Sequence, residues 1–155
     1  LAPRTLPAIV EGAEVKEIFV IEVSLKSRDF DTKNIVLIAK SIPQRVIYLL
    51  RFEDEAILAV YHTKLFTTTW QSLDSVSIPL NGLTLDAVWQ NTVAFVGKLE
   101  VAEGNSLTEQ IHVDEERARL IRQIESLERL MRSTSQPRRQ RELYSEIKKL
   151  KGGLS

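Results

Sequence analysis

Two apolar segments in the first half of the chain predict β-strands that are buried on both faces. Residues 17–25 read Glu-Ile-Phe-Val-Ile-Glu-Val-Ser-Leu, and residues 45–52 read Arg-Val-Ile-Tyr-Leu-Leu-Arg-Phe. Apolar, often β-branched side chains at both odd and even positions are typical of strands in the interior of a sheet. Between the two segments we expect a short helix to about residue 39, which Asp31 or Thr32 caps and which ends before Pro43.

The pattern that follows predicts further strands and then an amphipathic helix. Residues 53–55 form a polar turn, residues 56–61 a third strand, and residues 66–70 and 76–78 short edge strands. Thr84 then caps a helix whose apolar stripe is Leu85, Val88, Trp89, Thr92, Phe95, Val96 and Leu99. This strand–helix–strand–hairpin order predicts an α+β fold with a mixed sheet, because the first crossover is parallel and the next connections are antiparallel.

The C-terminal part of the chain shows a different pattern, with apolar residues at alternating steps of four and three. The predicted seams are separated by the helix-breaking residues 133–137 and consist of Leu120, Ile124, Leu127 and Met131, followed by Leu143, Ile147 and Leu150. Narrow seams at coiled-coil spacing, joined by a short break, predict an antiparallel helical hairpin. Because short helices are marginal alone, we expect this hairpin to dock on the body of the protein or on a partner.

These patterns divide the chain into three regions. We expect an α+β body over residues 1–102, a linker and the start of a helix over residues 103–114, and the helical hairpin over residues 115–155. The sequence opens at Leu1 without a methionine, and residues 1–7 contain two prolines. We interpret it as a fragment whose natural N-terminus has been removed.

Composition narrows the class of protein. The chain has 155 residues, no cysteine and two histidines, and its apolar runs are far too short to cross a bilayer. Without cysteine there is no disulfide, no thiolate zinc site and no cysteine nucleophile. We therefore expect a soluble, cytoplasmic protein that requires no cofactor and does not contact a membrane.

The neutral net charge hides an asymmetry between body and tail. Residues 1–114 carry 10 Lys and Arg against 15 Asp and Glu, whereas residues 115–155 carry 11 against 6. The candidate nucleic-acid contacts are Arg129, Arg132, Arg138, Arg139, Arg141 and Lys148. If Arg132, Arg138, Arg139 and Arg141 cluster at the hairpin tip, they form a compact positive surface that would neutralise phosphates and give salt-sensitive binding. The alternative is a solvated face with intrahelical ion pairs, such as Glu125–Arg129 and Glu128–Arg132.

The sequence shows no convincing catalytic constellation. Glu22 and Lys26 share one face of the first strand, but strand-borne nuclease motifs place the carboxylate and the lysine closer together. Arg51 is a better partner for Glu22 than a metal ion. His62 and His112 lack the neighbours of a general base, so we interpret both as surface or packing residues. We assign no catalytic, cofactor-binding or metal-ligating residue.

Four segments, taken in order, carry a family resemblance. They are residues 17–26, residues 40–52 with their Ile-Pro step, residues 78–86 (Ile-Pro-Leu-Asn-Gly-Leu-Thr-Leu-Asp) and residues 124–150. Together they resemble a bacterial family known only as domain of unknown function 4391, over nearly the whole chain. Members usually carry a further N-terminal helical segment, and the Ser-Thr-Ser-Gln-Pro-Arg-Arg tip is more broken here than in the family.

The resemblance implies no assigned activity, but it implies a bacterial accessory protein, often encoded near restriction–modification and helicase genes. We expect a non-catalytic interaction module of a bacterial complex, linked to DNA restriction or phage defence, which docks through its helical hairpin. The expected partner is another protein or a second copy of the chain. Two alternatives stay open: direct nucleic-acid binding by the basic tip, and a divergent metal-dependent nuclease.

Overall fold

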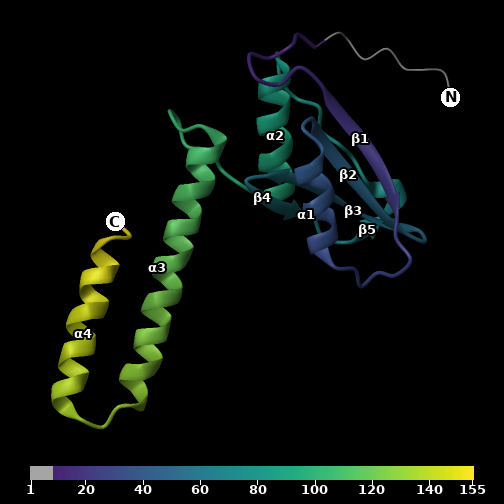
Figure 1. Cartoon of the computed structure of the whole chain (residues 1–155). Coiled ribbons are helices and arrows are strands. Elements are labelled where there is room, and N and C mark those ends of the chain that lie inside the picture. Colours follow the sequence, from purple (N-terminus) through teal and green to yellow (C-terminus); the bar gives the residue numbers. More distant parts are fainter. Residues whose placement is uncertain (1–8) are drawn as a thin grey trace. The chain divides into compact units, whose positions relative to one another are not determined.

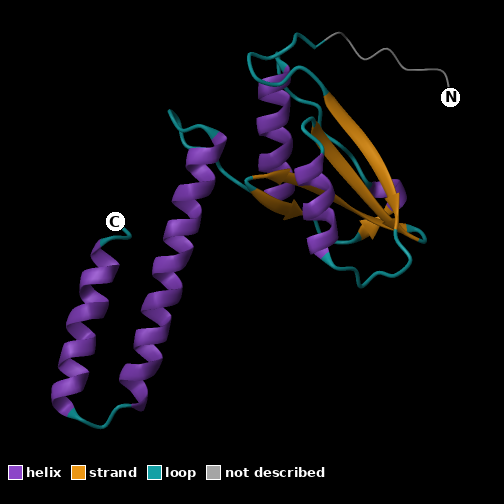
Figure 2. Cartoon of the chain, in the orientation of Figure 1, coloured by secondary structure: helices purple, strands orange, loops and turns teal. Residues whose placement is uncertain are grey.

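The structure is a computed structural model that describes residues 9–155, so the proline-containing residues 1–7 lie outside the described part. The chain divides into two compact units. The first, Leu1–Val101, contains all the strands and is called the sheet unit; the second, Ala102–Ser155, is called the hairpin unit. Figure 1 labels the elements of both units, and Figure 2 distinguishes helices from strands.

A five-stranded mixed sheet forms the framework of the sheet unit. Its order is β1-β2-β3-β4, and β5 pairs with β3 beside β4. β1 runs parallel to β2 and every other pair is antiparallel, which confirms the predicted α+β fold with a mixed sheet. The strands are β1 (Ile18–Ser24), β2 (Arg45–Phe52), β3 (Glu55–His62), β4 (Lys64–Thr67) and β5 (Gln71–Ser72).

Helix α1 (Thr32–Ser41) covers one face of this sheet. Asp31 caps the helix, since its side chain accepts a hydrogen bond of 2.9 Å from the Lys33 backbone N–H. The buried side chains beneath it are Ile35 of α1, Val46, Tyr48 and Leu50 of β2, and Ile57 and Ala59 of β3. These residues alternate along β2 and β3, as expected of side chains on a single face of a sheet.

Helix α2 (Leu85–Gly97) covers the opposite face. Gly97 packs so closely against the Phe66 ring that a Cβ atom at this position would lie 2.6 Å from it. Phe66 is in register with Val60, which alternates with the Ala59 side chain beneath α1. The predicted stripe needs two corrections. Phe95 is 51% exposed and Val93 is fully buried instead, and Leu99 lies beyond the end of α2 at Gly97. Val93 follows Trp89 by four residues and therefore shares its helix face.

Three predictions about strands need correction. β1 was predicted to be interior, but it lies at the edge of the sheet, and the side chains at its centre are exposed. Continuous apolar residues fit any strand with two apolar faces, so the pattern does not reveal how many neighbours the strand has. Residues 76–78 form no strand, because Val76 instead closes the 3₁₀ helix η1 (Leu73–Ser75) by donating to the Leu73 carbonyl. The segment predicted at residues 66–70 is replaced by β4 and β5.

The hairpin unit consists of α3 (Leu107–Ser133) and α4 (Pro137–Gly152), which confirms the predicted antiparallel pair. α3 begins with a capping box: Ser106 Oγ accepts from the Glu109 backbone, and the Glu109 carboxylate accepts from the Ser106 backbone at 2.7 Å. Pro137 occupies the first turn of α4, where its missing N–H is not needed. No helix of the described residues combines the length and the apolar composition needed to cross a membrane.

Candidate functional site

The predicted seam residues lie between α3 and α4. Ile124, Leu143 and Ile147 are buried, and the other four seam positions are half-buried: Leu120, Leu127, Met131 and Leu150. The two helices thus cover much of each other's apolar stripe. Burial of this kind supplies most of the stability of a short helix pair.

The turn between the two helices is held by hydrogen bonds from polar side chains. The Gln140 side-chain amide donates to the Thr134 carbonyl oxygen at 2.6 Å, and Ser133 Oγ donates to the Leu130 carbonyl at 2.9 Å. These bonds satisfy backbone groups that the helix ends leave without partners. The tip is therefore a defined turn, although its Ser-Thr-Ser-Gln sequence has no glycine.

The structure brings five of the six candidate nucleic-acid contacts together at this tip. Residues 129–141 contain five arginines and no acidic residue, and all five arginines are exposed. Arg129 and Arg132 belong to the last turns of α3, whereas the other three open α4. Lys148 lies farther along α4, more than one turn beyond Arg141. The N-terminal end of a helix carries a partial positive charge. The arginines at the start of α4 add to this positive charge, so the tip favours the binding of an anion.

The ion pairs of the hairpin unit differ from those considered in the sequence. Glu128 forms its ion pair with Lys151 of α4 at 3.1 Å, rather than with Arg132 one turn along its own helix. Arg138 and Arg139 both contact the carboxylate of Glu142, at 3.3 and 3.4 Å. A single carboxylate therefore serves two guanidinium groups, and both contacts are exposed and correspondingly weak.

The opposite, open end of the hairpin contains a groove of about 280 Å³, here called the open-end groove. Its lining residues are His112, Val113, Glu116, Arg117, Leu120, Gly153 and Leu154. Val113 is 50% exposed there. Sequence reasoning did not select Val113, although its spacing of seven from Leu120 continues the seam toward the N-terminal end of α3 and would have identified it.

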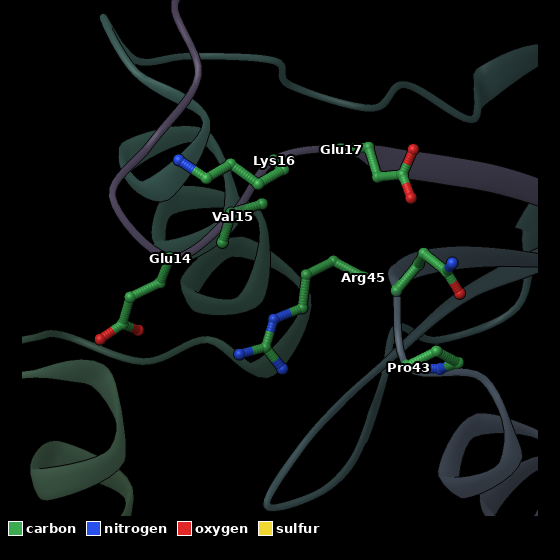
Figure 3. Close-up of a pocket in the computed structure, with 7 residues that line it drawn as sticks. Glu14, Val15, Lys16, Glu17, Pro43 and Arg45 are labelled. Carbon is green, nitrogen blue, oxygen red and sulfur yellow. The ribbon is translucent and has the colours of Figure 1, made fainter.

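The sheet unit has a shallow hollow of about 380 Å³ where the segment before β1 meets the start of β2. Its walls carry two carboxylates and two cationic groups: Glu14, Lys16, Glu17 and Arg45. Figure 3 shows the Glu14 and Arg45 side chains directed to the same side of the hollow, while Lys16 and Glu17 extend away from each other. Lys16 Nζ already donates to the Gly12 carbonyl oxygen at 2.8 Å.

One wall of this hollow is fixed by the carboxylate of Asp86 in the first turn of α2. It accepts hydrogen bonds from the backbone N–H groups of Ala13 at 2.6 Å, Val15 at 2.7 Å and Glu14 at 3.2 Å. These bonds, that of Val15 above all, lower the pKa of Asp86. Gly12 is required beside them, because a Cβ atom at this position would collide with the carboxylate.

Arg45 connects the hollow to the only tryptophan of α2. Its guanidinium carbon lies 5.5 Å from the centre of the Trp89 ring, and the Trp89 indole N–H donates to His62 Nδ1 at 3.0 Å. Burial, and secondarily the charge of Arg45, lowers the pKa of His62. His62 thus accepts a hydrogen bond from Trp89 and its ring lies beside the Trp89 ring, in agreement with its interpretation as a surface or packing residue.

Glu22 of β1, the carboxylate of the nuclease alternative, forms an ion pair with Arg51 of β2, the residue in register with Ser24. Its Oε1 atom is 3.4 Å from Arg51 Nη1, as the sequence suggested. β1 ends at Ser24, two residues before Lys26, so the strand does not carry that lysine. Within residues 9–155, no three His, Asp or Glu side chains gather closely enough to hold a metal ion.

Comparison with known proteins adds one finding. No curated protein and no solved structure matches the chain. The family model described as Domain of unknown function (DUF4391) matches residues 1–154, which is nearly the full length.

Proposed function

The chain belongs to the family of the domain of unknown function DUF4391, and from this premise we propose that it is a non-catalytic interaction module of a bacterial complex. In this proposal the hairpin unit docks onto a partner protein through the open-end groove. The complex acts in DNA restriction or phage defence, in keeping with the family resemblance.

The observation that carries the proposal is apolar surface outside the closed seam. Val113 and Ile121 are 50% and 39% exposed. Val113 lines the groove, and Ile121 lies beside it on α3, one four-residue step beyond the groove residue Arg117. Leu120 and Leu154 line the groove between them. Val113 and Ile121 stay exposed after the hairpin has closed, so a partner that covers them removes apolar surface from water.

Site-specific photo-crosslinking in the bacterial host tests this docking surface. A photoreactive amino acid at Val113 should capture one partner protein, and Ile121→Glu on the same surface should abolish that product. The matched control places the photoreactive group at Tyr144, which is also exposed but belongs to α4 outside the groove. Capture that is equal at both positions, or that survives Ile121→Glu, contradicts docking through the groove.

Direct nucleic-acid binding by the tip is the second candidate, supported by the five arginines of residues 129–141. Fluorescence anisotropy with duplex DNA and with RNA, over a series of salt concentrations, tests it. Replacing Arg129, Arg132 and Arg141 with glutamine should weaken binding. The salt slope, which is the slope of the logarithm of the binding constant against the logarithm of the salt concentration, should decrease in magnitude by about 3 if each arginine contacts one phosphate.

A matched control for the tip removes the same charge elsewhere on α3. It replaces Arg117, Arg119 and Arg122 with glutamine, which should leave the salt slope unchanged if the tip is the contact. Binding that does not depend on salt, or an equal loss in both triple variants, argues against nucleic-acid recognition by the tip.

The nuclease alternative has the least support, because the Glu22 carboxylate pairs with Arg51 at 3.4 Å. Mg²⁺-dependent cleavage of plasmid DNA, compared between the intact protein and Glu22→Gln, tests it. Cleavage that is lost in the variant would support the alternative, and the absence of cleavage by the intact protein would remove it.

A further inference from the structure

β1 presents an open edge along its whole length. It pairs with β2 on one side only, and no described segment pairs with its other side. The described chain before β1 is bound elsewhere: Val10 bridges to Thr84, and the N–H groups of residues 13–15 bond to Asp86. The outer backbone N–H and C=O groups of β1 are therefore available to another strand.

The open edge is also unusually apolar. Phe19, Val20 and Ile21, at the centre of the strand, are 45%, 53% and 37% exposed. Native edge strands are normally short, or carry Lys, Pro or a bulge that blocks pairing. β1 has seven residues without Lys or Pro, and its single charged residue, Glu22, forms an ion pair with Arg51 of β2. At the other edge, by contrast, the strands β4 and β5 have only four and two residues.

We propose that a second copy of this chain pairs with β1 in antiparallel orientation, so that the two sheets become one continuous sheet across the dimer. A two-fold axis normal to the sheet relates the copies, because residues directly opposite each other in an antiparallel pair point to the same face. In such a pairing one residue of β1, here called the centre, lies directly opposite the same residue of the other copy. This interface belongs to the sheet unit and is independent of the docking proposed for the hairpin unit.

The sequence of β1 selects Val20 as the centre. Phe19 and Ile21 share the α1 face, since their partners on β2 are Val46 and Tyr48. Centring on Val20 places Phe19 opposite Ile21 twice and Val20 opposite its own copy. The three exposed apolar residues are thereby paired with one another, which is the favourable cross-strand arrangement.

The neighbouring registers are less favourable. Centring on Ile21 places Val20 opposite Glu22, which sets an exposed apolar side chain against a carboxylate. Centring on Glu22 places two carboxylates directly opposite each other, where like charges repel. Centring on Phe19 leaves Ile21 opposite Glu17, just outside the strand. The Val20 register pairs the three exposed apolar residues with one another and sets only the half-buried Ile18 opposite Glu22, so it is the register in which the strand best complements itself.

The chain has no cysteine, which makes a direct test of this register possible. Directly opposite residues have Cα atoms about 4.5–5.5 Å apart, within the range that a disulfide spans. Val20→Cys should therefore give a covalent dimer on mild oxidation. Leu37→Cys on α1, a position that is 64% exposed and lies outside the strand edge, is the matched control and should stay monomeric in a denaturing gel. Crosslinking at Val20 no greater than at Leu37 overturns the proposal.

Sedimentation equilibrium of the full chain gives the second measurement. The unmodified chain should dimerise with increasing concentration, and Val20→Lys should shift the dissociation constant upward by at least tenfold, while Leu37→Lys leaves it unchanged. Because Val20 is more than half exposed, its replacement should leave the circular dichroism spectrum unaltered. A monomer at all concentrations, or a dimer that persists in Val20→Lys, overturns the proposal.

Discussion

The sheet unit and the hairpin unit bury their apolar residues in different ways. In the sheet unit, Leu58 of β3 is fully buried on the sheet face that α2 covers, beneath a helix that begins only at Leu85. In the hairpin unit, Leu143 is equally buried, but against a neighbouring helix across one short turn. The first core depends on strand register and on helices on both faces. The core of the hairpin unit depends on the apolar stripes of α3 and α4, which the short turn between the helices brings together.

The same contrast holds for carboxylates that accept backbone hydrogen bonds. Asp86 binds N–H groups of residues that precede it by 71 to 73 positions. Glu109 binds the Ser106 N–H, three positions away, and these hydrogen bonds lower the pKa of Glu109. The local bond follows from a sequence motif, whereas the distant one exists only when the whole unit is folded. Long-range contacts therefore govern the sheet unit, and short-range contacts the hairpin unit.

The largest expected effect is in the long-range core. Leu58→Ala should lower the free energy of unfolding of the sheet unit by about 2–5 kcal/mol, because a cavity opens where packed elements cannot collapse. Urea unfolding followed by tryptophan fluorescence measures this, since Trp70 and Trp89 both belong to the sheet unit. Leu37→Ala, at an exposed position of α1, is the control and should change stability by less than about 0.5 kcal/mol.

A smaller loss is expected from the matching change in the hairpin unit. Leu143→Ala should cost about 2 kcal/mol, at the low end of the usual range, because two helices can move together around the lost side chain. Circular dichroism at 222 nm during urea unfolding follows the helices. Tyr144→Ala, at the adjacent exposed position, should have little effect. A loss at Leu143 as large as that at Leu58 would contradict the contrast drawn between the two cores.

The distant carboxylate should make the stability of the sheet unit depend on pH. Because the folded pKa of Asp86 lies below its ordinary value of 3.8, ionised Asp86 stabilises the folded state above that value. This contribution is lost as the pH falls through the folded pKa. Asp86→Asn should therefore lower the unfolding midpoint at pH 7, and its difference from the unmodified protein should shrink below about pH 4.

The control for Asp86 is Asp54→Asn, which removes the same charge from an exposed residue of the turn between β2 and β3. Thermal unfolding of both variants from pH 2 to pH 7 gives the comparison. An Asp86→Asn difference that is constant over this range would show that the carboxylate charge is not the source of the effect.

The smallest expected effect has the opposite sign. The Tyr48 hydroxyl is buried and finds no hydrogen-bond partner among the described residues, and burial raises the pKa of this phenol. Tyr48→Phe keeps the ring in the core and removes the unsatisfied group, so the free energy of unfolding should rise by up to about 1 kcal/mol. Tyr144→Phe on the hairpin surface is the control and should change nothing. A loss of stability in Tyr48→Phe would show that the hydroxyl is bonded in the folded protein.

Local signals in the sequence predicted much of the fold. Asp31, Thr84 and Pro137 occupy the helix-starting positions that their chemistry favours, and the hairpin seam followed from its steps of four and three. The candidate basic residues could also be placed at a tip, because the break at residues 133–137 fixes where the chain reverses. The ion pair between Glu22 and Arg51 could be predicted because the two strands that carry them were expected to be neighbours.

The features that sequence reasoning missed depend on neighbours rather than on pattern. Nothing in residues 18–24 distinguishes a strand with two neighbours from one with a single neighbour, because both have apolar residues on both faces. Phe95 and Val93 are similarly interchangeable until β3 and β4 define which helix face is covered. The attachment of residues 13–15 to Asp86 has no signature along the chain.

The sequence by itself thus determined where α1, α2 and α4 begin, the parallel first crossover of a mixed sheet and the local pairing of α3 with α4, since these depend on backbone preferences and short-range periodicity. Only the tertiary structure decided that β1 is an open apolar edge, that the open-end groove exposes Val113, and that Asp86 holds the segment before β1. Each of these depends on which distant residues occupy or leave a neighbouring position in space. A one-dimensional pattern of apolar and polar residues does not contain that information.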